Sequence, residues 1–124
     1  MNLLIVDDSA VMRQMFLRTL RLSGLEIDSV LEAANGAEGL AVLRSQRVDV
    51  ALVDLNMPVM SGEEMIERAR DGTGAGGTRF VVVSTESGNA RIEALRAHGA
   101  AFVHKPFTPE ALRHTLLGLT GAST

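Results

Sequence analysis

Short apolar runs alternate with amphipathic stretches along the whole chain. The runs are partly β-branched and mostly apolar at consecutive positions, which is typical of parallel strands that are covered on both faces. The predicted strands are Leu3–Val6, Ser29–Leu31, Val48–Val53, Phe80–Val83 and Ala101–Val103. The stretches between them favour helices, because their apolar residues recur at helical spacing and capping residues precede several of them.

Five helices are predicted between and after these strands. They are Ala10–Leu22, Ala37–Arg44, Glu63–Arg70, Asn89–Ala97 and a last helix that begins at Thr108-Pro109-Glu110. The first helix has Ser9 as its expected N-cap. The apolar residues whose spacing indicates it are Val11, Met15, Leu20 and Leu22.

The strand-then-helix unit repeated five times, (βα)5, predicts an α/β fold. Such a fold is a doubly wound five-stranded parallel sheet with helices on both faces. Right-handed crossovers then bring the carboxyl ends of all the strands to one edge of the sheet. No linker or low-complexity segment divides the 124 residues, and a chain of this length can bury a sizeable core. We therefore predict a single domain spanning residues 1–124.

Composition excludes several classes of protein. The absence of cysteine rules out disulfides, zinc–thiolate sites and cysteine nucleophiles. The net charge of −3 argues against direct binding of nucleic acid. Neither a signal peptide nor an apolar run of about 18 residues is present. From this we expect a cytoplasmic protein that does not bind membranes.

Polar residues follow four of the five predicted strands, where open α/β sheets bind their ligands. Asp7 and Asp8 follow the first strand, Asp54 the third, Ser84 the fourth and Lys105, the only lysine, the fifth. Taken singly, an aspartate at such a turn could equally be a helix cap. Three carboxylates at one edge favour a hard divalent cation, and Mg²⁺ is the usual choice beside phosphate, although Mn²⁺ could replace it.

Four motifs then point to a family. They are Val6-Asp7-Asp8-Ser9, Val53-Asp54-Leu55-Asn56-Met57-Pro58, Ser84-Thr85-Glu86 and Lys105-Pro106-Phe107. In this order and spacing, the chain resembles the receiver domain of bacterial response regulators, and most closely the CheY-like, chemotaxis-type regulators that consist of one domain. The likeness covers essentially the whole chain. It implies a flavodoxin-like sheet with strand order 2-1-3-4-5.

The resemblance also implies a role for each residue at the sheet edge. Asp54 would accept a phosphoryl group from the phosphohistidine of a histidine kinase. Asp7 and Asp8 would hold Mg²⁺ together with Asp54 and the backbone carbonyl of Asn56. Lys105 would place a compact positive charge beside the phosphoryl group.

A conformational switch is implied as well. The Ser84 hydroxyl would bond a phosphoryl oxygen, although a backbone partner for this hydroxyl is the simpler alternative. Phe102 occupies the aromatic position that turns inward in the family, where many relatives have tyrosine, and it cannot donate a hydroxyl hydrogen bond. A plain core role for Phe102 stays open. Asn56 and Glu86 occupy positions that tune hydrolysis, so we expect a transient phosphoaspartate.

The expected function is that of a monomeric phosphorylation switch, which catalyses only its own phosphorylation and dephosphorylation. An output protein, for example a flagellar motor switch, would bind the face formed by the fourth helix, the fifth strand and the last helix. One alternative is the receiver domain of a longer regulator with a DNA-binding or cyclase module. Another is a Mg²⁺-dependent phosphohydrolase, but such enzymes usually need a second carboxylate two residues after the nucleophile, where this chain has Asn56. A flavin-binding protein is disfavoured because no Trp or Tyr is present.

Overall fold

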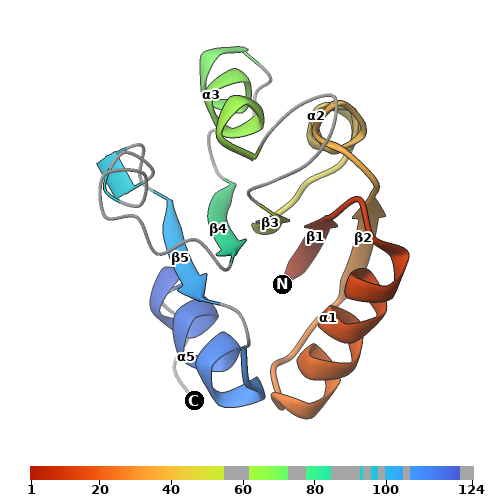
Figure 1. The fold of residues 1–124 in the computed structure, drawn as a ribbon, viewed down its shortest axis with the longest axis vertical. Helices are drawn as coiled ribbons and strands as arrows, with labels where there is room; N and C mark the ends of the chain where they lie inside the picture. The colour runs from red at the N-terminus through yellow and green to blue at the C-terminus, as the bar shows by residue number, and fades with distance from the viewer. Residues whose placement is uncertain are drawn as a thin grey trace.

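The computed structural model describes residues 1–54, 62–72, 78–84, 93, 96–97, 100–104 and 107–120. These residues form a sheet that lies between two groups of helices (Figure 1). The strands are β1 (Asn2–Val6), β2 (Ser29–Ala33), β3 (Val50–Asp54), β4 (Arg79–Ser84) and β5 (Ala101–His104). The helices with described bounds are α1 (Ala10–Leu22), α2 (Gly36–Ser45), α3 (Gly62–Gly72) and α5 (Pro109–Thr120).

The five strands are parallel and lie in the order β2-β1-β3-β4-β5, which confirms both the α/β class and the predicted strand order. Strand β3 is in the middle, and every one of its residues is buried. In the register, Val6 of β1 lies opposite Val53 of β3, and Asp54 lies opposite Val83 of β4. The carboxyl ends of β1, β3 and β4 are therefore neighbours at one edge of the sheet.

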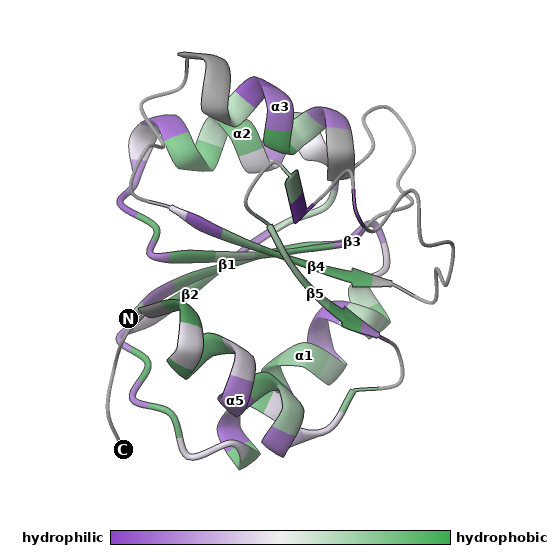
Figure 2. Cartoon of the chain, turned by 90° about the vertical axis from the view of Figure 1, so that its left-hand side faces the viewer, coloured by the Kyte–Doolittle hydropathy of each residue, from purple (hydrophilic) through white to green (hydrophobic). Residues whose placement is uncertain are grey.

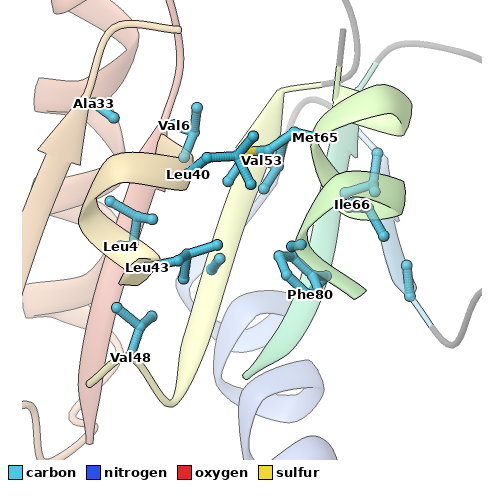
Figure 3. Packing of buried hydrophobic residues seen from close by; sticks show 14 residues of the cluster. Leu4, Val6, Ala33, Leu40, Leu43, Val48, Val53, Met65, Ile66 and Phe80 are labelled. Carbon is cyan, nitrogen blue, oxygen red and sulfur yellow. The ribbon is translucent and has the colours of Figure 1, made fainter. Parts of the chain in front are cut away.

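Helices cover both faces of the sheet, with α1 and α5 on one face and α2 and α3 on the other (Figure 2). Neighbouring residues of one strand contribute to opposite cores. Val53 belongs to the cluster beneath α2 and α3, whereas Leu52 belongs to the cluster beneath α1 and α5. Leu40 of α2 and Met65 of α3 meet Val53 in the first of these (Figure 3). Burial on both faces explains why the strands are apolar at consecutive positions.

Side-chain caps mark where three of the helices begin, and Asn35 caps α2 by accepting from the Glu38 amide at 2.9 Å. The Ser9 hydroxyl accepts a hydrogen bond from the Met12 amide at 3.2 Å, which confirms Ser9 as the N-cap of α1. The Thr108 hydroxyl accepts one from the Ala111 amide at 3.1 Å at the start of α5. In each case a side-chain oxygen pairs an amide that the first helical turn leaves without a partner.

The bounds predicted for α1 are correct, but the side chains that indicated it mostly face solvent. Val11, Met15 and Leu22 are 71%, 52% and 70% exposed, and only Leu20 of the four is buried. Phe16, one turn before Leu20, supplies the other buried anchor. Apolar residues occupy more than one face of this helix, so its spacing indicates a helix without indicating which face meets the sheet.

The remaining bounds agree with the prediction to within a few residues. Strand β2 continues to Ala33 instead of ending at Leu31, and β3 spans Val50–Asp54 instead of residues 48–53. The predicted helix Asn89–Ala97 falls mostly outside the described residues. Within the described segments, no helix combines the length and the apolar character that crossing a membrane requires.

Gly24, in the turn after α1, provides a test of backbone strain. Its φ of 76° is left-handed, and an added Cβ would lie 3.1 Å from Nη1 of Arg113, which donates to the Ser23 carbonyl. We expect Gly24→Ala to lower the free energy of unfolding by about 1–2 kcal/mol. Gly118→Ala, in open space on α5, should instead raise it by about 0.8–1 kcal/mol. Urea unfolding of both variants measures these changes, and equal changes in the free energy of unfolding would contradict backbone strain at residue 24.

Candidate functional site

Three carboxylates meet at the carboxyl edge of the sheet. Asp7 and Asp8 directly follow β1, and Asp54 is the last residue of the neighbouring β3. One oxygen from each of the three lies within 4.8 Å of the others. Asp7 is 1% exposed and Asp54 is 9% exposed, whereas Asp8 is open to solvent. The structure thus brings together the three aspartates that were predicted at this edge because they follow the carboxyl ends of parallel strands.

The loop after β1 is held by hydrogen bonds on several sides. The Asp7 amide donates to the Ala33 carbonyl of β2 at 3.1 Å. Asp7 Oδ1 accepts from the Ser9 amide at 2.9 Å. The Asp7 carbonyl accepts from Nη1 of Arg13 at 2.6 Å. Both the backbone and the carboxylate of Asp7 are therefore oriented before any ligand arrives.

The donor set at this edge fits a hard divalent cation. Carboxylates this close repel one another, and burial of Asp7 and Asp54 removes much of the water that would screen the repulsion. A cation between them relieves that repulsion. Because all three donors are oxygens, the cluster suits Mg²⁺ or Mn²⁺ better than a metal that prefers nitrogen or sulfur ligands.

The other predicted site residues are described only in part. Ser84 ends β4 beside β3, so its backbone reaches the same edge, but its side chain lies outside the described residues. Lys105, Asn56 and Glu86 also lie outside them. Strand β5 ends at the residue before Lys105. The roles of these four side chains stay predictions.

Phe102 is described, and it lies on the edge strand β5. Its ring is partly buried and packs against the apolar cluster beneath α2 and α3. The ring centroid is 6.3 Å from that of His104, with the two planes tilted by 55°. The ring thus has both an apolar contact inward and a surface that solvent reaches, which is compatible with a side chain that changes position.

Two contacts of α1 near this edge were not anticipated. Besides its bond to the Asp7 carbonyl, Arg13 donates through Nε to Glu32 of β2 at 3.0 Å. Phe16 stacks on Phe107, the second residue after Lys105, with centroids 4.6 Å apart. The sequence offers one signal for these contacts: α1 begins two residues after Asp8, so the side chains of its first turns must lie near the sheet edge.

Comparison with known families identifies the family to which the chain belongs. Residues 3–117 match the response regulator receiver domain. The chain belongs to this family. The matched range contains every residue assigned to the sheet edge, from Asp7 to Lys105.

Individual relatives of this receiver domain cover nearly all of its length. It is 37% identical to a chemotaxis protein CheY homolog of Campylobacter jejuni, over 100% of this chain and 95% of that protein. It is 35% identical to chemotaxis protein CheY1 of Helicobacter pylori, over 99% of each chain. The structure of Vibrio cholerae chemotaxis protein CheY4 superimposes with a TM-score of 0.80 at 37% identity, covering 95% of this chain and 97% of the other.

Proposed function

We propose that this receiver domain is a phosphorylation-dependent switch in a two-component system and that Asp54 is its phosphoacceptor. The observation that carries the proposal is the position of Asp54 at the end of the central strand, with its carboxylate grouped with those of Asp7 and Asp8. Of the three, Asp54 ends the central strand and is 9% exposed, whereas Asp7 is 1% exposed and accepts a hydrogen bond from its own loop. Asp54 is therefore the carboxylate best placed to react.

In the proposed reaction, a carboxylate oxygen of Asp54 attacks the phosphorus of a phosphohistidine on a histidine kinase. The P–N bond breaks, its electron pair returns to the imidazole nitrogen, and an acyl phosphate forms on Asp54. Water later attacks the same phosphorus and releases inorganic phosphate, which restores the carboxylate. The catalysis of this chain is limited to these two steps on its own side chain.

Mg²⁺ is the proposed cofactor, held by Asp7, Asp8, Asp54 and the backbone carbonyl of Asn56. When bound, it supplies positive charge that offsets the charge on the phosphoryl oxygens. The support is the all-oxygen donor set within 4.8 Å and the hydrogen bond from the Ser9 amide, which orients Asp7.

Lys105 and Ser84 are proposed to contact the phosphoryl group from the side opposite the metal. The lysine adds a point charge and the serine a hydroxyl donor, and such positioned charges are what phosphoryl transfer requires. Phe102 then fills the space that Ser84 vacates, so that modification of Asp54 changes the surface at β5 and α5. Asn56 and Glu86 are proposed to orient the water that ends the signal.

Similarity to CheY proteins over nearly their whole length supports a role in chemotaxis. The phosphodonor is then a histidine kinase, and the output partner, for which the flagellar motor switch is the candidate, binds the face around β5 and α5. We place the protein in the cytoplasm, because histidine kinases draw their phosphate from cytoplasmic ATP, and we propose that it acts as a monomer.

Incubation of the intact protein with Mg²⁺ and a small acyl phosphate tests this proposal. On a phosphate-affinity gel, we expect a retarded band that disappears when EDTA removes the metal and that fades after the donor is removed. An unshifted band in Mg²⁺ would contradict the phosphoacceptor. An equal shift in EDTA would contradict the metal requirement while leaving the phosphoacceptor in place.

A further inference from the structure

Arg13 connects three elements at the acidic edge of the sheet. It lies in the first turn of α1, and its side chain is only 17% exposed. Nη1 donates to the backbone carbonyl of Asp7 at 2.6 Å, and Nε donates to Glu32 of β2 at 3.0 Å. The planar guanidinium can serve both acceptors at once because its donors diverge in a fixed fork.

The carbonyl that Arg13 contacts belongs to the peptide bond between Asp7 and Asp8. The plane of a peptide is rigid, so holding its carbonyl oxygen also holds the direction in which the chain continues to the Cα of Asp8. The amide on the other side of Asp7 is bound to the Ala33 carbonyl. Asp7 is thus held between β2 and α1, whereas Asp8, exposed and followed by the N-cap Ser9, depends on this peptide for its orientation.

Glu32 keeps Arg13 in place and offsets its charge. It lies one residue before Ala33 on β2 and opposite Ile5 of β1, which puts it close to the same edge. The Arg13–Glu32 ion pair is partly shielded, with 17% and 39% of the two side chains exposed. The Arg13–Glu32 pair has no net charge. Arg13 can therefore contact the loop after β1 without adding a full positive charge that would repel a cation.

We infer that Arg13 is a positioning residue for the divalent cation, which acts by fixing the Asp7–Asp8 peptide so that both carboxylates face the ion. The inference rests on the metal site proposed above. A positioning role and a purely electrostatic role of Arg13 predict opposite changes in cation affinity when Arg13 is replaced. Removing a nearby positive charge should by itself tighten cation binding, whereas loss of a positioning contact should weaken it.

The test measures Mn²⁺ affinity from the electron paramagnetic resonance signal of the free ion, without any phosphodonor. We expect Arg13→Met to raise the dissociation constant about tenfold, which is at the lower end of the effect of removing an outer contact to a metal ligand. Arg13→Lys keeps the charge, but its single nitrogen should pair with Glu32 and lose the Asp7 carbonyl. It should therefore weaken binding to a similar degree.

Arg18→Met is the matched control. Arg18 is an exposed arginine of the same helix and has no ion-pair partner among the residues that the structure describes. Its replacement removes the same charge and should leave the dissociation constant at the wild-type value. Urea unfolding of each variant shows whether it is folded. If Arg13→Met does not fold, the Mn²⁺ affinity of Arg13→Lys tests the positioning role.

Each outcome has a definite meaning. Weaker binding in the Arg13 variants with unchanged binding in Arg18→Met supports the positioning role. Unchanged or tighter binding in a folded Arg13 variant overturns it and leaves the metal site intact. Absence of Mn²⁺ binding in the wild type overturns the metal site itself, and the role of Arg13 with it.

Discussion

Replacing Asp54 with alanine is expected to abolish phosphorylation, with the retarded band falling below about 1% of its wild-type intensity. The variant removes the nucleophilic oxygen, and the described part of the chain offers no equivalent one. Asp7 is buried and hydrogen-bonded within its loop, and Asp8 is not on the central strand. The same gel assay with Mg²⁺ and a small acyl phosphate measures the effect.

Asp28→Ala provides the control for Asp54→Ala. Asp28 is 78% exposed and forms an ion pair with the amino terminus, so its removal should leave the retarded band unchanged. The Asp54 variant should also be at least as resistant to urea as the wild type without metal, because one of three mutually repelling carboxylates is gone. A folded Asp54→Ala protein that still shifts would contradict the assignment.

Replacing Lys105 with arginine is expected to impair activation even though the charge is kept. A lysine ammonium is a compact point charge on a flexible stem, whereas the planar guanidinium is broader and spreads its charge over three nitrogens. We expect the rate of phosphorylation by a small acyl phosphate to fall about tenfold, since a misplaced charge stabilises the transferring group less well. The variant should also show smaller amide chemical-shift changes in β5 and α5 when phosphorylated.

Arg79→Lys is the reciprocal exchange at the opposite end of the sheet. Arg79 is exposed and begins β4, whereas the acidic cluster lies where the strands end. This variant should keep the wild-type rate and the wild-type shift changes. Wild-type behaviour of phosphorylated Lys105→Arg in both measurements would refute the special role of lysine.

The sheet and the acidic cluster could be predicted because they depend on simple repeating features. Consecutive apolar residues identify β1 and β3, and parallel strands must end at one edge, so Asp7, Asp8 and Asp54 were expected there. The strand order itself came from the family resemblance, because the apolar pattern of a strand does not say which neighbour it pairs with.

The contacts made by α1 could not be predicted in the same way. Periodicity indicates a helix, but Val11 and Met15 are exposed while Phe16 is buried, because apolar residues occupy more than one face of this helix. Which residues are buried depends on how the helix packs against β1 and α5, as the stack of Phe16 on Phe107 shows. The bond from Arg13 to the Asp7 carbonyl depends on that same rotation.

The partly buried ring of Phe102 has an optical consequence. The chain contains neither Trp nor Tyr, so its near-ultraviolet absorption and emission come from four weakly absorbing phenylalanines. An indole placed at residue 102 would be the sole strong chromophore of the molecule. Its emission colour would report directly how much water surrounds the edge strand, with no background from the rest of the chain.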